Sequence, residues 1–594
     1  MRLAVHFLVL LLLAIPGSAQ DAAAPPVAVT YALDVTDPKS GIARVEMRIE
    51  NNRDDEVTLG IPIWAPGSYR VVSYYLGVQD LEAEVDGKKV PVAATDHKSL
   101  WTVKTGGASR FTVRYSLKPG EVMPLRGHLT AEHYDLQGPS AWLFVKDRMN
   151  GPHKVTFKLP ADWKVGTGLK KLDSDAYGER DYDTFIDCPI ELGTFDLHTF
   201  TEGGVAYEIV VHATETFDAP KLVDTCRRIV AEQARMFGGA PFERYVFLYH
   251  FRNQVGGAGL EHLNSTHITY MMSRIKGDPA TIASLTSHEF FHLWNVKRIR
   301  PKELGPFDYT QPVRSKALWL SEGVTSYYGD LTLARAGLWT PAVYFDHLSR
   351  EVNDLQDNPA RKTQSVEQSS WTVWDRARGD LTTSIDYYNK GELLGWLLDM
   401  KIRVATGGRK SFDDVMRHLY RTGVVEPAKA GRGPIGVGFE EDGILKAVNA
   451  VSGQDFSGFF TKYIAGTEEL PYAEVLGEAG LSFSRKKALP LSLRDVRVSS
   501  EPIADTEAKQ EGIRRGDRIV KVGDVEVATA DDIAKALELL KVGEKVAVHL
   551  KRRDEEGELR KELTVRDGRY VVGFSSTATE AQKALLEGWL APSK

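Results

Sequence analysis

The sequence predicts a multidomain α+β protein, with a β-sandwich at residues 27–200, a mainly helical domain at 201–475 and a small mixed domain at 478–570. Three observations predict this fold class. The 594 residues are too many for one hydrophobic core, and about three domains are expected for this length. Apolar residues alternate with period two in the first third of the chain, whereas helical periodicity dominates the middle. Glycine-rich turns then separate short strands and one helix near the end.

Residues 1–19 have the pattern of a secretory signal peptide. Arg2 precedes a mostly apolar run, and small residues up to Ala19 form a cleavage pattern. The apolar run is shorter than the roughly 20 residues that a membrane-spanning helix needs. We therefore expect an exported protein, secreted or periplasmic, with no membrane span after cleavage.

Composition excludes some function classes. Apolar residues make up 42% and charged residues 26% of the chain, as in an ordinary soluble protein. The net charge is −6 and there is no basic tract, so nucleic acid is not an expected partner. Cys188 and Cys226 are the two cysteines. An exported protein permits a disulfide between them, but Cys226 falls in a helix expected from Leu222 to Met236, where a buried thiol is equally compatible.

Alternating apolar and polar residues predict the strands of the first domain. Ala43–Glu50 and Phe111–Leu117 show this alternation most clearly. Turn-rich segments separate such runs, which is typical of a β-sandwich. Beyond residue 200 we expect a few early strands and then helices, among them 386–405, 411–421 and 439–451.

Residues 288–292, His-Glu-Phe-Phe-His, are the most specific motif of the chain. Helical residues four positions apart lie on one face, so His288 and His292 can bind one Zn²⁺ through their ring nitrogens. Glu289 is then placed to accept a proton from the attacking water, as in zinc peptidases. Asp278 can cap a helix expected over 280–297, which places both histidines in its middle.

A catalytic zinc ion usually takes three protein ligands, so a third is expected on a second rigid element. Residues 317–328 form a mostly apolar helical run with one acid, Glu322. A lone carboxylate there is costly to bury unless it is paired or bound to a metal. We predict Glu322 as the third ligand of one catalytic Zn²⁺, and an ion-paired helix acid is the alternative.

These motifs resemble the glycyl aminopeptidase family of zinc metallopeptidases. The zinc segment 288–298 and the later segment 318–323 carry the resemblance in the middle of the chain. Trp64–Arg70 resembles the Trp-x-Pro-Gly-Ser-Tyr signature of the family's N-terminal domain, and Asp187–Gly193 resembles its junction to the catalytic part. The resemblance implies that residues 201–475 form a thermolysin-like catalytic domain.

The distance from the second histidine to the third ligand distinguishes the glycyl group from the aminopeptidase N relatives. Twenty-nine residues lie between His292 and Glu322, which is longer than in those relatives. The extra length, Arg300 to Val313, is rich in proline and glycine and is interpreted as an inserted loop. This spacing is typical of the glycyl group.

The family resemblance also implies a substrate anchor upstream of the zinc motif. Residues 257–262, Gly-Ala-Gly-Leu-Glu-His, resemble the exopeptidase motif of the family, with Ala258 as a departure. A carboxylate near the metal would select substrates with a free amino terminus, since that amine is a cation. We assign Glu261 as the amine anchor and Gly259 as the point where peptide backbone lies close, with His262 as a possible substrate contact.

A peptidase also needs a donor for the oxyanion that forms as water attacks. Residues 385–392 resemble the family's Tyr-x-Lys-Gly segment, which implies Tyr388 as this donor, although Tyr387 is a competitor. The support of the histidines is less clear, because Ser326 stands where related sites often have an aspartate. We interpret Lys297, Arg298 and Arg300 as capping and salt-bridge residues rather than substrate contacts.

Residues 478–570 resemble a PDZ domain. Gly516-Asp517 and the following helix and strand carry the match, and Gly480–Phe483 is the expected peptide loop. Such domains bind extended peptides or C-termini by strand addition, although a purely structural role is also open. The remaining residues, 571–594, are expected to form a helical tail.

The favoured hypothesis is a secreted or periplasmic zinc aminopeptidase that removes N-terminal residues from peptides. The family implies a preference for Gly and Ala as first residue. One alternative is a zinc endopeptidase that cuts unfolded exported chains with help from the PDZ domain. The other is a non-catalytic peptide-binding protein.

Overall fold

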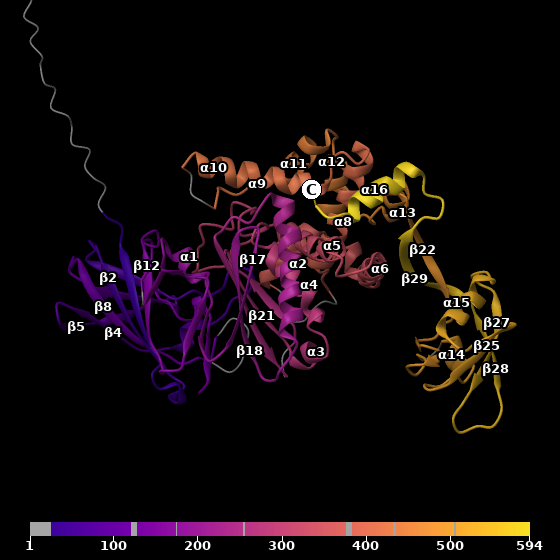
Figure 1. Cartoon of the computed structure of the whole chain (residues 1–594), viewed down its shortest axis with the longest axis horizontal. Coiled ribbons are helices and arrows are strands. Elements are labelled where there is room, and N and C mark those ends of the chain that lie inside the picture. Colours follow the sequence, from indigo (N-terminus) through magenta and orange to yellow (C-terminus); the bar gives the residue numbers. More distant parts are fainter. Residues whose placement is uncertain are drawn as a thin grey trace, which may run out of the picture.

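The computed structural model describes residues 25–119, 127–173, 175–253, 256–375, 383–431, 435–503 and 506–593. It shows a sheet-rich domain at one end, a helix-rich domain in the centre and a small domain at the other end (Figure 1). The expected signal peptide at 1–19 lies outside the described residues. Within the described ranges, no helix has both the length and the apolar character needed to cross a membrane.

The N-terminal domain packs three sheets around one apolar core. The largest sheet has, in spatial order, β14 (Lys170–Lys171), β15 (Ala176–Glu179), β12 (His153–Lys158), β1 (Ala28–Asp34), β2 (Ala43–Glu50), β8 (Arg110–Leu117), β4 (Val78–Val85) and β5 (Lys88–Val90). The second sheet is β11 (Phe144–Val145), β3 (Glu56–Gly60), β7 (Leu100–Lys104) and β6 (Val92–Ala94). The third is β13 (Lys164–Thr167), β16 (Ile190–Gly193), β10 (His133–Leu136) and β9 (His128–Leu129).

The predicted sheet-rich domain is therefore confirmed. Strands β2 and β8 bury every second residue and pair with each other, as their alternation predicted. The short helix α1 (Tyr182–Ile186) follows β15 and precedes β16 in the chain. Both cysteines are buried free thiols, so the disulfide alternative is wrong.

The central domain begins with a five-stranded sheet. Its spatial order is β17 (Asp196–Glu202), β18 (Val205–Ala213), β19 (Arg244–Arg252), β21 (Ser265–Met271) and β20 (Ala258–Glu261). One face carries aromatic residues such as Phe247, which packs on Phe290 of α4 (Ala283–Phe291), called the zinc helix below because it carries the predicted zinc motif. The other face turns toward the third sheet of the N-terminal domain, as the 2.9 Å contact between His250 and Glu191 shows.

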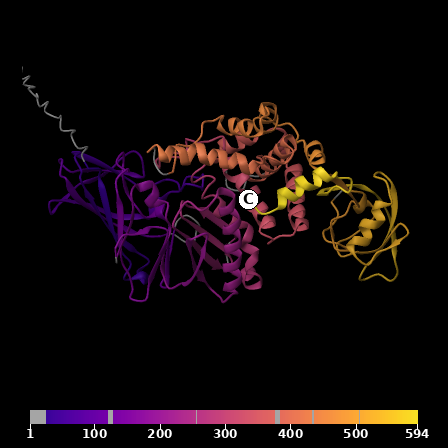
Figure 2. The same cartoon turned by 45° about the horizontal axis from the view of Figure 1, so that its top comes forward.

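Helices make up most of the rest of this domain. They are α2 (Ala219–Phe237), α3 (Met272–Gly277), α4 (Ala283–Phe291), α5 (Thr325–Arg335), α6 (Pro341–Asp357), α7 (Val366–Trp371), α8 (Tyr387–Thr406), α9 (Phe412–Tyr420), α10 (Glu426–Lys429), α11 (Gly443–Ser452), α12 (Ser457–Phe459) and α13 (Tyr472–Ala479). A π-helical turn, η5 (Trp319–Val324), leads directly into α5. Figure 2 shows these helices gathered beside the central sheet.

Three sequence-based boundaries need correction. The expected domain limit at residue 200 falls inside β17, which belongs to the central sheet from Asp196 onward. The helix expected over 280–297 begins as a 3-10 turn capped by Asp278 and ends at Phe291, so His292 is its C-cap rather than a mid-helix residue. The helix expected over 439–451 starts only at Gly443.

The C-terminal part contains a small domain with its own core. Its sheet is β23 (Leu493–Arg494), β24 (Arg497–Val498), β25 (Arg518–Val522), β27 (Lys545–Lys551) and β28 (Leu559–Thr564), with β26 (Val525–Glu526) paired to β25. Helices α14 (Glu507–Gln510) and α15 (Ala530–Glu538) complete it. Helix α16 (Glu580–Leu590) then returns to the central domain, where the indole of Trp589 donates to Tyr327 at 2.9 Å.

A two-stranded ribbon of β22 (Leu481–Ala488) and β29 (Arg566–Phe574) joins the small domain to the central one. The expected peptide loop at Gly480–Phe483 is therefore wrong, because Gly480 caps α13 and the next residues start β22. Phe483 stacks on Tyr570 of β29, with ring centroids 4.8 Å apart. The domain limit expected at residue 570 lies inside this ribbon for the same reason.

Candidate active site

The structure brings the three predicted metal ligands together. Nε2 of His288 and Nε2 of His292 are 3.0 Å apart, and their rings are nearly perpendicular. Oε2 of Glu322 lies 3.2 Å from Nε2 of His292 and 3.6 Å from Nε2 of His288. Ligands about 2.0–2.1 Å from a tetrahedral ion stand roughly 3.3 Å from one another, so this spacing fits one zinc ion.

The outer nitrogens of both histidines are held by protein groups. Nδ1 of His292 contacts the carbonyl oxygen of Asn295 at 2.7 Å, and Nδ1 of His288 contacts the hydroxyl of Ser326 at 3.2 Å. Ser326 thus supplies the support that the sequence left unclear. Metal-binding histidines are usually oriented in this way, with the second nitrogen turned outward.

Charge at this site also favours a cation. Glu261, Glu289 and Glu322 are all buried here, and Oε1 of Glu322 has no hydrogen-bond partner among the described residues. Burial lowers the pKa of His292, but the charges of Glu322 and Glu261 outweigh burial and raise this pKa to about 9. The donor set and its excess negative charge therefore fit a divalent zinc ion.

Glu289 lies against the strand that carries the expected substrate anchor. A Cβ atom at Gly259 would stand 2.1 Å from Oε1 of Glu289, so only glycine fits there. Burial raises the pKa of Glu289 well above its ordinary value, and its Oε2 has no partner among the described residues. A carboxylate with a raised pKa is suited to accept a proton and then return it.

Replacing Gly259 with alanine tests this packing. We expect Gly259→Ala to lower kcat by at least about 10²-fold while the protein stays folded, because the new methyl group displaces the Glu289 carboxylate. Gly257→Ala, two residues earlier in the chain, is the matched control. A Cβ atom there would stand 3.1 Å from the edge of the Tyr270 ring and away from Glu289, so kcat is expected to change much less. Equal activity of the two variants would contradict the assigned contact.

The anchor Glu261 is covered by a loop of the N-terminal domain. A Cβ atom at Gly67 would stand 2.5 Å from Oε2 of Glu261, and Gly67 has a positive φ of 92° that favours glycine. Sequence reasoning used the Trp64–Arg70 motif only as a family match and missed this contact. The loop and the β20 strand together enclose Glu261, whose pKa burial raises to about 7.

Three tyrosines surround the ligand Glu322. The Tyr388 ring stacks on the His288 ring at 5.9 Å, and Tyr387 stacks on Tyr388 at 5.0 Å. Burial and the charge of Glu322 raise the pKa of Tyr388, so its hydroxyl keeps the proton it would donate. Tyr69, which sequence reasoning did not single out, has a left-handed φ of 43°, and burial and the charge of nearby Glu322 raise the pKa of its hydroxyl.

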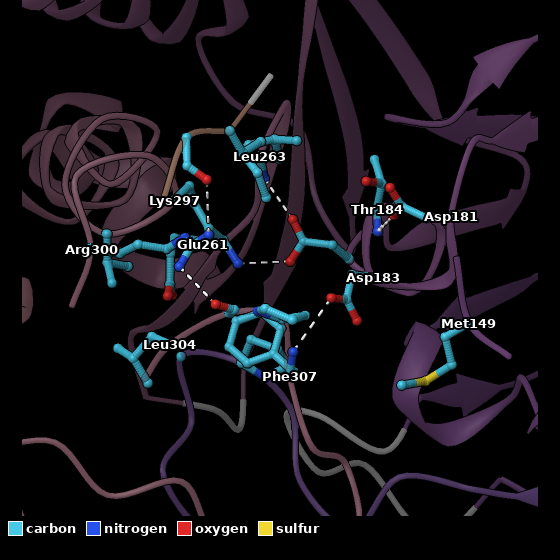
Figure 3. Close-up of a pocket in the computed structure, with 18 of the residues that line it drawn as sticks. Met149, Asp181, Asp183, Thr184, Glu261, Leu263, Lys297, Arg300, Leu304 and Phe307 are labelled. Carbon is cyan, nitrogen blue, oxygen red and sulfur yellow. Dashed lines mark hydrogen bonds and ion pairs between the residues drawn. The ribbon is translucent and has the colours of Figure 1, made fainter. Parts of the chain in front are cut away.

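A cavity of about 500 Å³ opens on the side of Glu261 (Figure 3). Its walls come from both domains and from the inserted loop predicted over Arg300 to Val313, which contributes Leu304 and Phe307. That loop is fixed to the N-terminal domain, because Tyr309 donates to Asp183 at 2.7 Å. The insertion therefore forms a wall of this cavity.

The basic residues after the zinc motif make structural contacts, but Lys297 and Arg300 also line the cavity, so their exclusion as substrate contacts stays a prediction. Lys297 pairs with Asp187 at 2.7 Å, and Arg298 donates to the carbonyl oxygen of Leu293 at 2.7 Å. His262 is not among the residues that line the cavity; its Nδ1 lies 3.3 Å from Asp187, and it lines a separate small pocket. A direct substrate contact by His262 stays a prediction.

Family comparisons agree with this site. The model described as M61 glycyl aminopeptidase matches residues 281–394, which hold the metal triad and the paired tyrosines. The peptidase M61 N-terminal domain model matches residues 30–194. The chain carries both M61 domains. These matches make the protein a metallopeptidase and hence a hydrolase, and a PDZ domain model matches residues 477–563.

A solved structure shows the same fold. An aminopeptidase N family protein from Idiomarina loihiensis is 24% identical, with a TM-score of 0.75 over 95% of this chain and 100% of that chain. An M1 zinc metallopeptidase from Deinococcus radiodurans, a mutant bound to a Tyr-Ser-Ala substrate, is 14% identical, with a TM-score of 0.48 over 75% of this chain and 95% of that chain. Among curated proteins, no significant match was found.

Proposed function

We propose that this metallopeptidase is a zinc-dependent aminopeptidase. The observation that carries the proposal is the position of Glu261, a buried carboxylate within 4.8 Å of donor atoms of His292 and Glu289. A free amino terminus is a cation at neutral pH, and a carboxylate beside the metal ligands would hold it one residue from the scissile bond.

His288, His292 and Glu322 would hold the zinc ion, which, when bound, polarises the scissile carbonyl and makes water more acidic. Glu289 accepts the proton of the attacking water and then returns it to the leaving amine. Tyr388 donates a hydrogen bond to the oxyanion, since its ring lies against His288 and its hydroxyl is neutral. Gly259 lets the strand pack directly on Glu289, which holds this base beside Glu261.

For the first residue we propose Gly, after the description of the matching model as a glycyl aminopeptidase, and Ala as the next larger side chain. The cavity of about 500 Å³ beside Glu261 has room for a larger side chain, so Leu and Phe belong in the same substrate panel. We further propose export to the periplasm or outside the cell, supported by the pattern of residues 1–19. The PDZ domain is proposed to bind extended peptide segments.

Glu261→Gln tests the assigned anchor. We expect kcat/KM for a free-amine substrate to fall about 10–10³-fold, because the uncharged amide no longer attracts the ammonium group. The loss should be much smaller for the N-acetylated form of the same peptide, if any cleavage of it is measurable. Glu367→Gln makes the same change in a half-buried acid outside the site and should leave kcat/KM unchanged. An equal loss on both substrates would contradict the anchor role.

A further inference from the structure

A second cluster of histidines and carboxylates lies on the far face of the central sheet. His267 of β21 is paired with Leu260, whereas Glu261 is paired with Thr266, so the same hairpin turns Glu261 and His267 to opposite faces. His250 of β19 lies on the same face as His267, within 4.7 Å between ring centroids. This face packs on the N-terminal domain, whereas the opposite face packs on the zinc helix.

The N-terminal domain presents two carboxylates to these histidines. Asp135 of β10 and Glu191 of β16 are directly paired across the two strands, so both side chains lie on one face. Nε2 of His267 is 3.1 Å from Oδ1 of Asp135. Donor atoms of Asp135, His250 and His267 all lie within 4.8 Å of one another. The donor atoms of the predicted zinc ligands His288, His292 and Glu322 meet the same limit.

Two ring nitrogens of this cluster make no hydrogen bond to the described residues, although one of them faces Asp135. Nδ1 of His250 and Nε2 of His267 are buried and make no hydrogen bond of good geometry with any described residue. His250 is 1% exposed and His267 is 5% exposed, so bulk water does not supply the missing hydrogen bonds. Buried polar atoms are almost always satisfied, and Oε1 of Glu322 shows the same feature at the catalytic site.

The supporting contacts are those of a metal site. Oε2 of Glu191 contacts Nε2 of His250 at 2.9 Å, which leaves Nδ1 of His250 for an ion. Gln137 donates to Oδ1 of Asp135 at 2.8 Å and orients that carboxylate. A ligand histidine whose other nitrogen is held by a carboxylate is a recurring arrangement in zinc proteins.

We propose that Asp135, His250 and His267 bind a second divalent transition-metal ion, with Zn²⁺ as the favoured ion, between the N-terminal and central domains. Two imidazoles and one carboxylate suit Zn²⁺ and its neighbours rather than Ca²⁺ or Mg²⁺, which prefer oxygen ligands. The charges of Asp135 and Glu191 balance those of the ion. Because its ligands come from two domains, the ion would stabilise their interface, and the proposal is independent of the enzyme's substrate.

Metal content of the full chain tests the proposal. The protein is stripped with a chelator, loaded with Zn²⁺, passed through metal-free buffer and analysed for zinc per chain. We expect a second ion in the wild type, and one remaining ion in the variant His288→Ala/His292→Ala, which lacks the catalytic site. One ion in the wild type would overturn the proposal, and so would none in the double variant.

Variants of the cluster locate the second ion. In the background without the catalytic site, His250→Ala and His267→Asn are expected to remove the remaining zinc and the rise in Tm that added Zn²⁺ produces. His212→Ala is the matched control, since His212 stacks on His133 at 3.7 Å but is outside the ligand set. Retention of zinc by His267→Asn would overturn the assignment. If His250→Ala does not fold, the proposal is still tested by the zinc content of the wild type and by the Tm shift that Zn²⁺ produces in His288→Ala/His292→Ala.

Discussion

Replacing Glu289 with glutamine is expected to lower kcat by about 10²–10⁴-fold, the range typical of losing a general base. The amide keeps the size of the carboxylate and its packing on Gly259, where a Cβ atom would stand 2.1 Å away. It cannot accept the proton of the attacking water. Steady-state kinetics on a glycyl or alanyl substrate measure the loss.

Zinc content and Tm are the controls for Glu289→Gln. Glu289 is not among the three residues assigned as ligands, so the variant should keep its zinc, and removal of a buried carboxylate should not lower Tm. A variant with full zinc and more than a tenth of the wild-type kcat would contradict the role of Glu289 as the base.

Removing a metal ligand is expected to have the second large effect. Glu322→Ala deletes the carboxylate that lies 3.2 Å from Nε2 of His292, and it should weaken zinc binding by more than about 10²-fold and abolish turnover. Zinc affinity is measured by competition with a chromophoric chelator. Excess Zn²⁺ should restore little activity, because the geometry of the site is lost.

Ser326→Ala is the comparison for Glu322→Ala. The Ser326 hydroxyl contacts the outer nitrogen of His288 at 3.2 Å and donates to the backbone carbonyl oxygen of Glu322 at 3.1 Å, but it is not a predicted ligand, so a loss of about 10–100-fold in zinc affinity is expected. If Glu322→Ala lost no more affinity than Ser326→Ala, Glu322 would be an ion-paired helix acid rather than a ligand.

The three zinc ligands could be predicted because they follow from residue types and their spacing within short segments of the sequence. Two histidines four positions apart share a helix face in nearly any context, and a lone acid in an apolar helix needs a partner. The contact between Gly67 and Glu261 could not be predicted in the same way. It depends on how two domains pack against each other, and this packing cannot be predicted from the sequence pattern of either segment alone.

Other sequence-based expectations failed where tertiary contacts override local preference. The residues after Phe291 are apolar enough to continue a helix, yet the chain turns so that Asn295 reaches His292 with its carbonyl oxygen. Phe483 looked like part of a peptide loop, but stacking on Tyr570 places it in the ribbon that joins two domains. The histidines at positions 250 and 267 are 17 residues apart and carry no motif, so only the sheet register brings them together.

The measurement that tests the central claim most directly is hydrolysis of chromogenic glycyl, alanyl, leucyl and phenylalanyl substrates, each beside its N-acetylated form. The account predicts cleavage of the free amines only, which is lost in Glu289→Gln. Cleavage of the acetylated forms at similar rates would contradict an aminopeptidase and indicate an endopeptidase. No cleavage of any substrate by zinc-loaded protein would contradict the account and indicate a peptide-binding protein.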